Sequence, residues 1–142
     1  MEHQEALTKL QAFSPTGNED ADVEALYALI DELGALKDDP AVRRDMIMIF
    51  ERFPKADLGS PGPIVHALEK SPIDAHVELL AESIRRQATM MTVWMAQRCF
   101  RSKLSDQNRK LLLDALRDAL AKISRSGELA MSIEETLSKY GN

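Results

Sequence analysis

A serine, a histidine and a glutamate lie close together in the stretch DLGSPGPIVHALEK, which covers residues 57–70. Ser60, His66 and Glu69 are the residue types that act as nucleophile, base and orienting acid in many hydrolases. A nucleophile elbow, however, has the pattern G-x-S-x-G between a strand and a helix, whereas Gly59 directly precedes Ser60 and no strand-like segment comes before it. A phosphate-binding loop needs a Lys after its second glycine, and none follows here. We therefore expect no catalytic residue and no enzyme.

A metal site is the second chemistry to consider. His66 and Glu69 are three positions apart, which would place two ligands on one face of a helix. A protein site needs a third and usually a fourth ligand, but His76 lies beyond a proline and Cys99 is the single cysteine. We interpret His66 as a structural histidine, hydrogen-bonded near the core or paired with Glu69. The expectation is no metal and no cofactor, and a metal protein or enzyme centred on these residues is kept as a third hypothesis.

The same stretch fits the beginning of a helix. Ser60 is a preferred N-cap residue, and Pro61 would then occupy the first helical position, where a missing N–H costs nothing. Gly59 supplies a permissive backbone for the approach from the preceding segment, and the Gly62 N–H is the expected donor to the serine oxygen. We predict that this corner is a rigid helix start.

Helical spacing of apolar residues extends over almost the whole chain, and no strand-like alternation of useful length appears. Asn18 and Ser105 are the expected N-caps of two helices. The tetrapeptide SIEE at residues 132–135 fits a capping box, with Ser126 as an alternative start for the last helix. The apolar stripes begin at Val23, Val42, Ile64, Ile73, Leu112 and Ile133.

Short links between these helices imply antiparallel neighbours. The sequence therefore predicts an all-α fold, an irregular stack of antiparallel helical hairpins of the HEAT/ARM type with about seven helices in a single domain of residues 1–142. Within residues 1–18, a short helix followed by a loop at residues 14–18 is expected.

Residues 89–100 (TMMTVWMAQRCF) are apolar on nearly all sides, which is typical of a helix packed between neighbours. Trp94 is interpreted as a core anchor rather than a ligand platform. Arg98 lies four residues later and is expected to pair with an acid or with a helix end. The methionines are expected to fill the core, although they would also suit an adaptable binding surface.

The composition indicates a cytoplasmic protein. One cysteine permits no internal disulfide, the first residues show no basic segment followed by an apolar one, and the apolar runs are too short for a membrane span. No membrane partner is expected.

Charge is distributed unevenly along the chain. Ten acidic and two basic residues give residues 1–40 a charge of −8, whereas the rest of the chain carries +3, within a net charge of −5. An acidic surface disfavours nucleic acid, which is bound through lysine and arginine, and favours a basic protein partner. A merely solvated surface is the alternative interpretation. The expected contact residues are Asp20, Asp22, Glu24, Asp31, Glu32, Asp38 and Asp39.

Two motifs together resemble a known family. One is a GSPG-x-x-VH-x-x-E corner, and the other is a T-x-x-T-V-W-M-x-x-R helix. They are similar to the signature of the small all-helical immunity proteins of bacterial polymorphic-toxin and contact-dependent growth-inhibition systems. The likeness covers residues 50–102, and Ala88 departs from it where a proline is expected, which would loosen the helix start. The matching positions are Gly59, Ser60, Pro61, Gly62, Val65, His66, Glu69, Thr89, Thr92, Val93, Trp94, Met95 and Arg98.

The resemblance implies a protein that binds a cognate toxin domain, often a nuclease, and blocks it stoichiometrically without being an enzyme. The shared motif residues would then be scaffold, and variable surfaces would select the toxin. The alternative function is a helical-repeat adaptor that holds a peptide or protein in an apolar groove, for example one lined by Met90, Met91 and Trp94.

Overall fold

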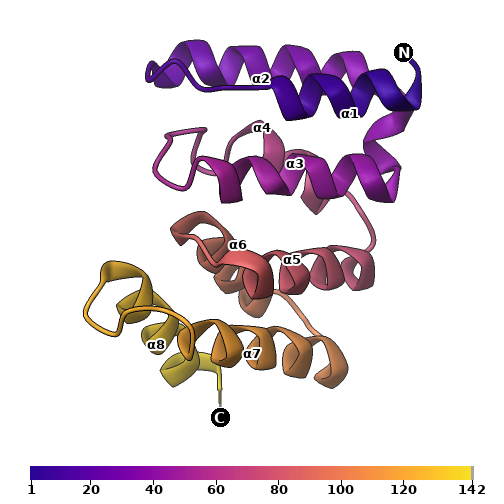
Figure 1. Cartoon of the computed structure of the whole chain (residues 1–142). Helices are drawn as coiled ribbons and strands as arrows, with labels where there is room; N and C mark the ends of the chain where they lie inside the picture. Colours follow the sequence, from indigo (N-terminus) through magenta and orange to yellow (C-terminus); the bar gives the residue numbers. More distant parts are fainter. Residues whose placement is uncertain (142) are drawn as a thin grey trace. The chain divides into compact units, whose positions relative to one another are not determined.

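The computed structural model describes residues 1–141, which contain eight α-helices, one short 3₁₀-helix and no strand (Figure 1). The predicted all-α fold is confirmed, with one helix more than expected. The chain divides into two compact units, Met1–Pro72 and Ile73–Asn142. The first unit holds α1 (His3–Ala12), α2 (Glu19–Leu33), η1 (Gly34–Asp38), α3 (Pro40–Arg52) and α4 (Gly62–Glu69). The second holds α5 (Ile73–Gln87), α6 (Met90–Arg101), α7 (Asp106–Leu120) and α8 (Glu128–Tyr140).

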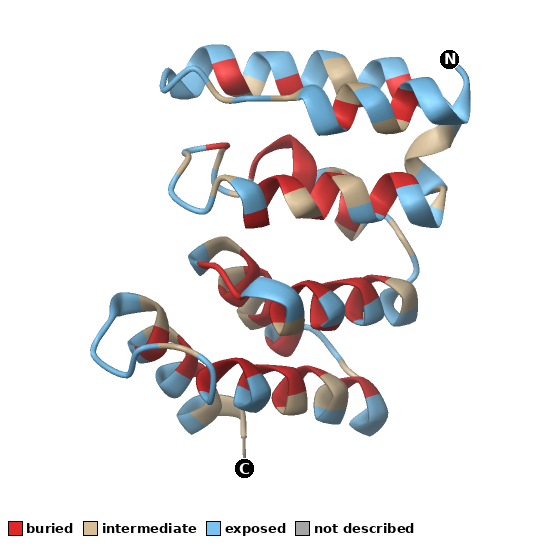
Figure 2. Cartoon of the chain, viewed as in Figure 1, coloured by how far each residue is buried: buried red, intermediate tan, exposed pale blue. Residues whose placement is uncertain are grey.

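In the first unit, each helix packs on the helix two places along the chain. α1 lies on α3 and α2 lies on α4, so that two antiparallel hairpins stack on each other (Figure 1). Their inward faces are the buried stripes in Figure 2 and include Leu10, Leu26, Met46 and Leu68. Burial of such leucine and methionine side chains stabilises the unit by roughly 1.5–3 kcal/mol each.

The second unit repeats this arrangement. α5 packs along α7 and α6 packs along α8, with Leu80, Met95, Leu112 and Ile133 completely buried between them. Phe100 and Tyr140 stack with ring centroids 4.9 Å apart, which fastens the end of α6 to the end of α8.

The side chain of Arg52 on α3 binds the C-terminal end of α1. The guanidinium of Arg52 donates to the carbonyl oxygens of Leu10 at 2.9 Å and Gln11 at 2.8 Å. These carbonyls belong to the last turn of α1, where the Leu10 carbonyl also accepts from the N–H of Phe13, the C-cap residue, at 3.3 Å. Arg52 therefore adds two side-chain hydrogen bonds to the C-terminal end of a helix that lies far earlier in the chain.

Both N-caps expected from the sequence are present. The Asn18 side chain accepts from the Ala21 N–H at 3.0 Å, and the Ser105 hydroxyl accepts from the Asn108 N–H at 3.1 Å. At α6, the hydroxyls of Thr89 and Thr92 form a reciprocal capping box. This box sets a defined start directly after Ala88, so the expected loosening is not found there.

The prediction for the start of α4 is wrong in detail. The helix begins at Gly62 and not at Pro61, and Ser60 is exposed and forms no side-chain cap. The Ser60–Pro61 peptide bond is cis, and Gly59 has φ +105°. A Cβ atom on Gly59 would collide with the Cα atom of Gly62. The backbone turns tightly between Gly59 and Gly62, and Ser60 does not cap the first turn of α4. The residue types that favour an N-cap do not predict such a turn.

The last helix also begins earlier than its capping-box pattern predicts. Gly127 is the N-cap residue of α8, next to the alternative start at Ser126. Ser132 lies inside the helix, where its carbonyl accepts the Thr136 hydroxyl at 2.7 Å. The SIEE pattern is therefore not a helix start, because Leu129 and Ala130 extend the apolar side of α8 toward its N-terminus.

Candidate functional site

The exposed side of α2 forms an acidic surface, which we call the acidic face and define as Glu19, Asp20, Glu24, Asp31 and Glu32. Leu26, Ile30 and Leu33 are buried on the side of the helix opposite Asp20, Glu24 and Asp31. Acidic residues in the first turn interact favourably with the positive end of the helix dipole, which helps α2 to begin after Asn18. The periodicity of the buried residues thus determines which carboxylates reach the surface.

Four carboxylates of the acidic face are uncommitted. Those of Glu19, Asp20, Glu24 and Asp31 form no hydrogen bond or ion pair with another side chain among residues 1–141. Glu32, in contrast, accepts from Lys9 of α1 at 2.5 Å. Hydrogen bonding to Glu32 is the largest cause of the raised pKa of Lys9. Negative charge is therefore available to a partner at Glu19, Asp20, Glu24 and Asp31, and less so at Glu32.

Asp38, the last residue of η1, and Asp39, which follows it, have different roles. Asp39 caps α3, accepting from the N–H groups of Ala41 at 2.9 Å and Val42 at 3.1 Å, and it contacts His3 Nε2 at 3.0 Å. The hydrogen bond from His3, followed by those from the backbone, lowers the pKa of Asp39. Asp38 is exposed and remains available.

Asp22 does not belong to the exposed surface, although it was expected to contact the partner. Its side chain is buried, with the residue 3% exposed. Oδ1 accepts from the N–H and the hydroxyl of Thr16, and Oδ2 accepts from the N–H of Gly17. Asp22 thus orders the loop between α1 and α2. It sits at the position that precedes Leu26 by one helical turn, on the inward side of α2.

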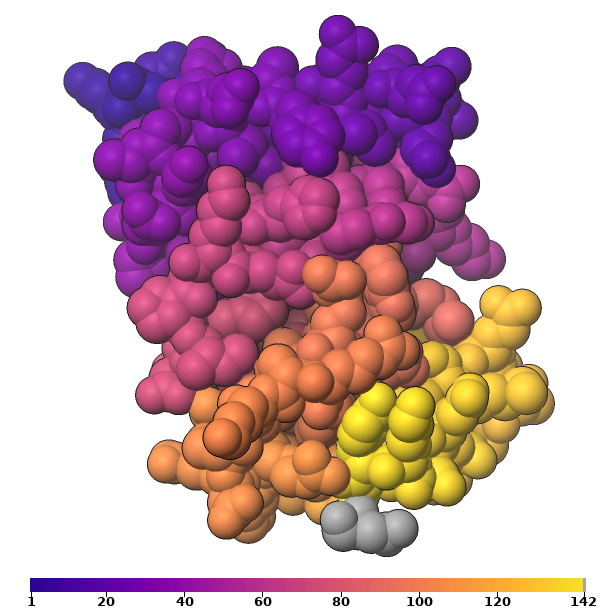
Figure 3. Space-filling model, turned by 180° about the vertical axis from the view of Figure 1, so that it is seen from behind, coloured from indigo at the N-terminus to yellow at the C-terminus, as the bar shows by residue number. Residues whose placement is uncertain are grey.

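A hollow of about 480 Å³ lies between the N-terminal half of α2 and the glycine–proline corner, and we call it the Tyr27 hollow. Tyr27 is 46% exposed, and its hydroxyl shares a hydrogen bond of 3.4 Å with His66 Nδ1 on α4. In the space-filling view, α2 and α4 lie next to each other on this side of the first unit (Figure 3). The lining consists of Glu19, Asp20, Val23, Glu24, Tyr27, Gly59, Ser60, Pro61, Gly62 and His66.

The serine and the histidine of the quoted stretch both line this hollow, but Glu69 does not. His66 is exposed and shares its hydrogen bond with Tyr27, so its polar contact lies at the surface and not near the core, the first of the two alternatives expected from the sequence. Glu69 is half-buried on the same helix. Within residues 1–141 no group of three or more His, Cys, Asp and Glu side chains has the arrangement that would hold a metal ion.

The apolar helix α6 presents less of its surface to the core than the sequence suggested. Met90 is exposed, Met91 and Trp94 are half-buried, and the Arg98 guanidinium lies 5.4 Å from the Trp94 ring centroid. Arg98 thus contacts an aromatic face, a partner that was not anticipated.

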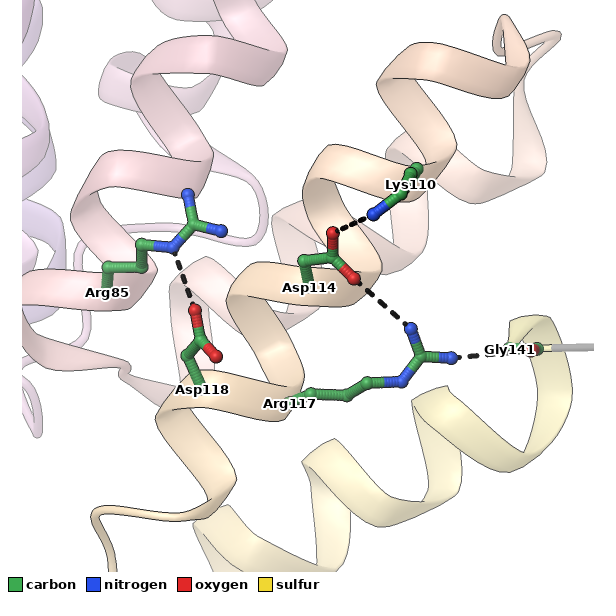
Figure 4. Close-up of polar contacts among 6 residues, drawn as sticks. All are labelled: Arg85, Lys110, Asp114, Arg117, Asp118 and Gly141. Atoms are coloured by element: carbon green, nitrogen blue, oxygen red, sulfur yellow. Dashed lines mark hydrogen bonds and ion pairs between the residues drawn. The ribbon is translucent and has the colours of Figure 1, made fainter.

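Asp118, a polar side chain of α7, connects this helix to a neighbouring helix of the second unit, since it pairs with Arg85 of α5 at 3.2 Å. Within α7, Asp114 accepts from Lys110 at 2.6 Å (Figure 4). The hydrogen bond from Lys110 is the largest cause of the lowered pKa of Asp114. A second hollow beside these residues, between α5 and α7, is lined by Asp74, Glu78, Ala81, Glu82, Arg85, Ser105, Gln107, Asn108 and Leu111.

Tyr27 was missed as a candidate by sequence reasoning. The available signal was its place one residue outside the apolar stripe of α2, where a large aromatic residue has no core to fill.

No helix among residues 1–141 combines the length and the apolar composition needed to cross a bilayer. Comparison with protein-family models, with curated proteins and with solved structures found no match to the chain.

Proposed function

We propose that this chain is an immunity protein, which binds a toxin domain, most simply a basic nuclease domain, and blocks it by covering its active surface. The paired motifs of residues 50–102 suggest the family, and the acidic face suggests how the partner is held. The observation that carries the proposal is the set of uncommitted, exposed carboxylates of Asp20, Glu24 and Asp31 on the single helix α2.

Electrostatics explains why such a surface suits this task. A nuclease that grips phosphates presents lysine and arginine, and an inhibitor with an acidic surface attracts it from a distance and associates quickly. Asp38 extends the negative surface at the end of α2, whereas Asp22 is excluded by its burial. The partner is thus a protein, and nucleic acid is repelled by the same charges.

The decisive experiment uses the toxin domain encoded beside this gene, expressed with and without the chain. We expect growth to be rescued and a one-to-one complex to be isolated. The triple variant Asp20→Asn, Glu24→Gln and Asp31→Asn should associate at least about tenfold more slowly at low salt, with little difference at high salt.

A matched control variant removes the same number of negative charges at positions outside the acidic face. Asp57→Asn, Glu128→Gln and Glu135→Gln neutralise three exposed acids that form no ion pair among residues 1–141. This variant should bind like the unaltered chain. Absence of a neighbouring toxin domain, or failure to rescue growth, would contradict the proposed function.

The adaptor function makes a different prediction. Binding to a peptide through Met90, Met91 and Trp94 would persist at high salt, because it would depend on apolar contact. Met90→Ser is the variant that distinguishes the two functions, since it should leave toxin binding unchanged.

A further inference from the structure

We propose that the Tyr27 hollow is the pocket that receives one arginine side chain of the protein partner. This inference rests on the proposed function for the identity of the partner, but the chemistry of the pocket can be tested without it. The occupant follows from the charges, the aromatic face and the rigidity of the lining.

The charge of the lining favours a cation. Glu19, Asp20 and Glu24 place three carboxylates along one side of the hollow, and no lysine or arginine lines it. The carboxylates of Asp20 and Glu24 have no partner among the described residues, so a bound guanidinium would not have to displace an existing ion pair. Arginine can donate to two carboxylates at once through its planar fork of N–H groups.

An aromatic surface distinguishes this hollow from an ordinary acidic patch. Tyr27 is a large exposed ring on the same helix as the carboxylates, one turn after Val23 and near Glu24. A guanidinium is attracted to the face of such a ring and stacks on it, and exposed tyrosines are frequent anchors of protein interfaces. The ring and the carboxylates can therefore hold the same side chain.

The lining is also held in place before any partner binds. The hydroxyl of Tyr27 shares a hydrogen bond of 3.4 Å with His66 Nδ1, which connects the ring to α4. The opposite wall is the corner from Gly59 to Gly62, where the backbone is folded so closely that a Cβ atom on Gly59 would not fit. A pocket that is already formed loses little conformational freedom when it is occupied.

The first experiment needs no toxin. N-acetyl-arginine amide is titrated into the chain while the Tyr27 ring and the Gly59 and Gly62 amides are followed by NMR. We expect saturable shifts confined to these groups and to Asp20 and Glu24. Its neutral isostere, Nα-acetyl-citrulline amide, should cause no such shifts. Nα-acetyl-lysine amide, which keeps a charged ε-ammonium, should bind more weakly than the arginine compound because an ammonium group cannot stack on the ring.

Two variants at one position separate the ring from its hydroxyl. Tyr27→Ala should weaken binding of the arginine compound by roughly tenfold, whereas Tyr27→Phe should stay within about threefold because it keeps the ring. Tyr27 is exposed, so both variants should fold, and Tyr140→Phe in the second unit is a matched control with no expected effect. Shifts spread evenly over all acidic residues, or no shifts, would overturn the pocket.

The complex with the toxin then distinguishes the two proposals. If the toxin is neutralised and Tyr27→Ala binds it as tightly as the unaltered chain, the function stands and the pocket inference is overturned. If the arginine compound binds at Tyr27 but no toxin is neutralised, the pocket stands and the proposed function fails. An at least tenfold loss of toxin affinity in Tyr27→Ala, with Tyr27→Phe unaffected, would support both.

Discussion

Asp22 Oδ1 accepts two hydrogen bonds from Thr16, one from the backbone N–H and one from the hydroxyl, each 2.8 Å long. A single carboxylate on α2 therefore fixes the conformation of the loop that precedes the helix. This relationship explains why an acid on an otherwise exposed, acidic stretch is buried, and it leads to the first prediction.

Asp22→Asn should destabilise the first unit, because an amide can accept only with its oxygen and leaves at least one loop donor without a partner. Thermal unfolding should occur several degrees lower at neutral pH. Asp20→Asn, two residues earlier on the exposed side of α2, should leave the unfolding temperature almost unchanged. Equal effects of the two substitutions would contradict the structural role of Asp22.

The pH dependence of stability provides a second test of Asp22. The backbone hydrogen bond from Thr16 is the largest cause of a folded-state pKa below the ordinary 3.8. The stabilisation is therefore complete above pH 3.8 and is lost as the pH falls through the lower pKa of the folded state. The difference in stability between the unaltered chain and Asp22→Asn should shrink in acid, as measured by urea unfolding at several pH values.

Gly59→Ala should be strongly destabilising. An alanine there would adopt φ +105° and would also push its Cβ atom against the Cα atom of Gly62. Gly17→Ala is the matched control, since Gly17 has φ +93° but no atom lies near its Cβ position. We expect a loss of about 1–2 kcal/mol for Gly17→Ala from the backbone conformation alone, and a clearly larger loss for Gly59→Ala. Chemical denaturation measures both.

Leu112→Ala should lower the free energy of unfolding by about 3 kcal/mol, because the side chain is completely buried on α7 and its removal leaves a cavity. The neighbouring Leu111 is half-buried beside the hollow between α5 and α7, and Leu111→Ala should cost less than about 1 kcal/mol. Similar losses for the two variants would show that α7 is not packed as described.

Arg43→Met should stabilise the chain. Arg43 is 6% exposed, and its Nε and Nη2 atoms have no hydrogen-bond partner among the described residues. Burial is the main cause of its lowered pKa, and attraction by Asp38 compensates only in part. Replacing such a charge by an apolar side chain of similar length should raise the free energy of unfolding by about 1 kcal/mol. Arg44→Met, at the exposed neighbouring position, should have almost no effect.

Local signals in the sequence were sufficient for most of the fold. The periodicity of residues such as Leu26 and Leu80 identifies the inward side of each helix, and Asn18 and Ser105 identify two helix starts, because these patterns depend only on neighbouring residues. The start of α4 could not be predicted in this way. It depends on contact between Gly59 and Gly62 across a tight corner, and a serine followed by a proline looks the same in either arrangement.

The candidate site depends still more on tertiary structure. The sequence identifies the acids of α2, but it cannot indicate that Asp22 turns inward to a loop while Asp20 remains free. Nor can it bring Tyr27 next to His66, which is 39 positions away and joins it only because α2 packs on α4. A residue whose role depends on contacts with residues far away in the sequence can be recognised only when the fold is known.

The hydrogen bonds that Arg52 donates to the end of α1 have a consequence for the order of assembly. A helix of ten residues is too short to persist in water by itself, and the guanidinium that binds its last carbonyls comes from α3. α1 should therefore acquire its protection against hydrogen exchange late, together with α3, although its residues are synthesised before those of α3. Its amides should also be the first of the unit to exchange when the Arg52 side chain is truncated.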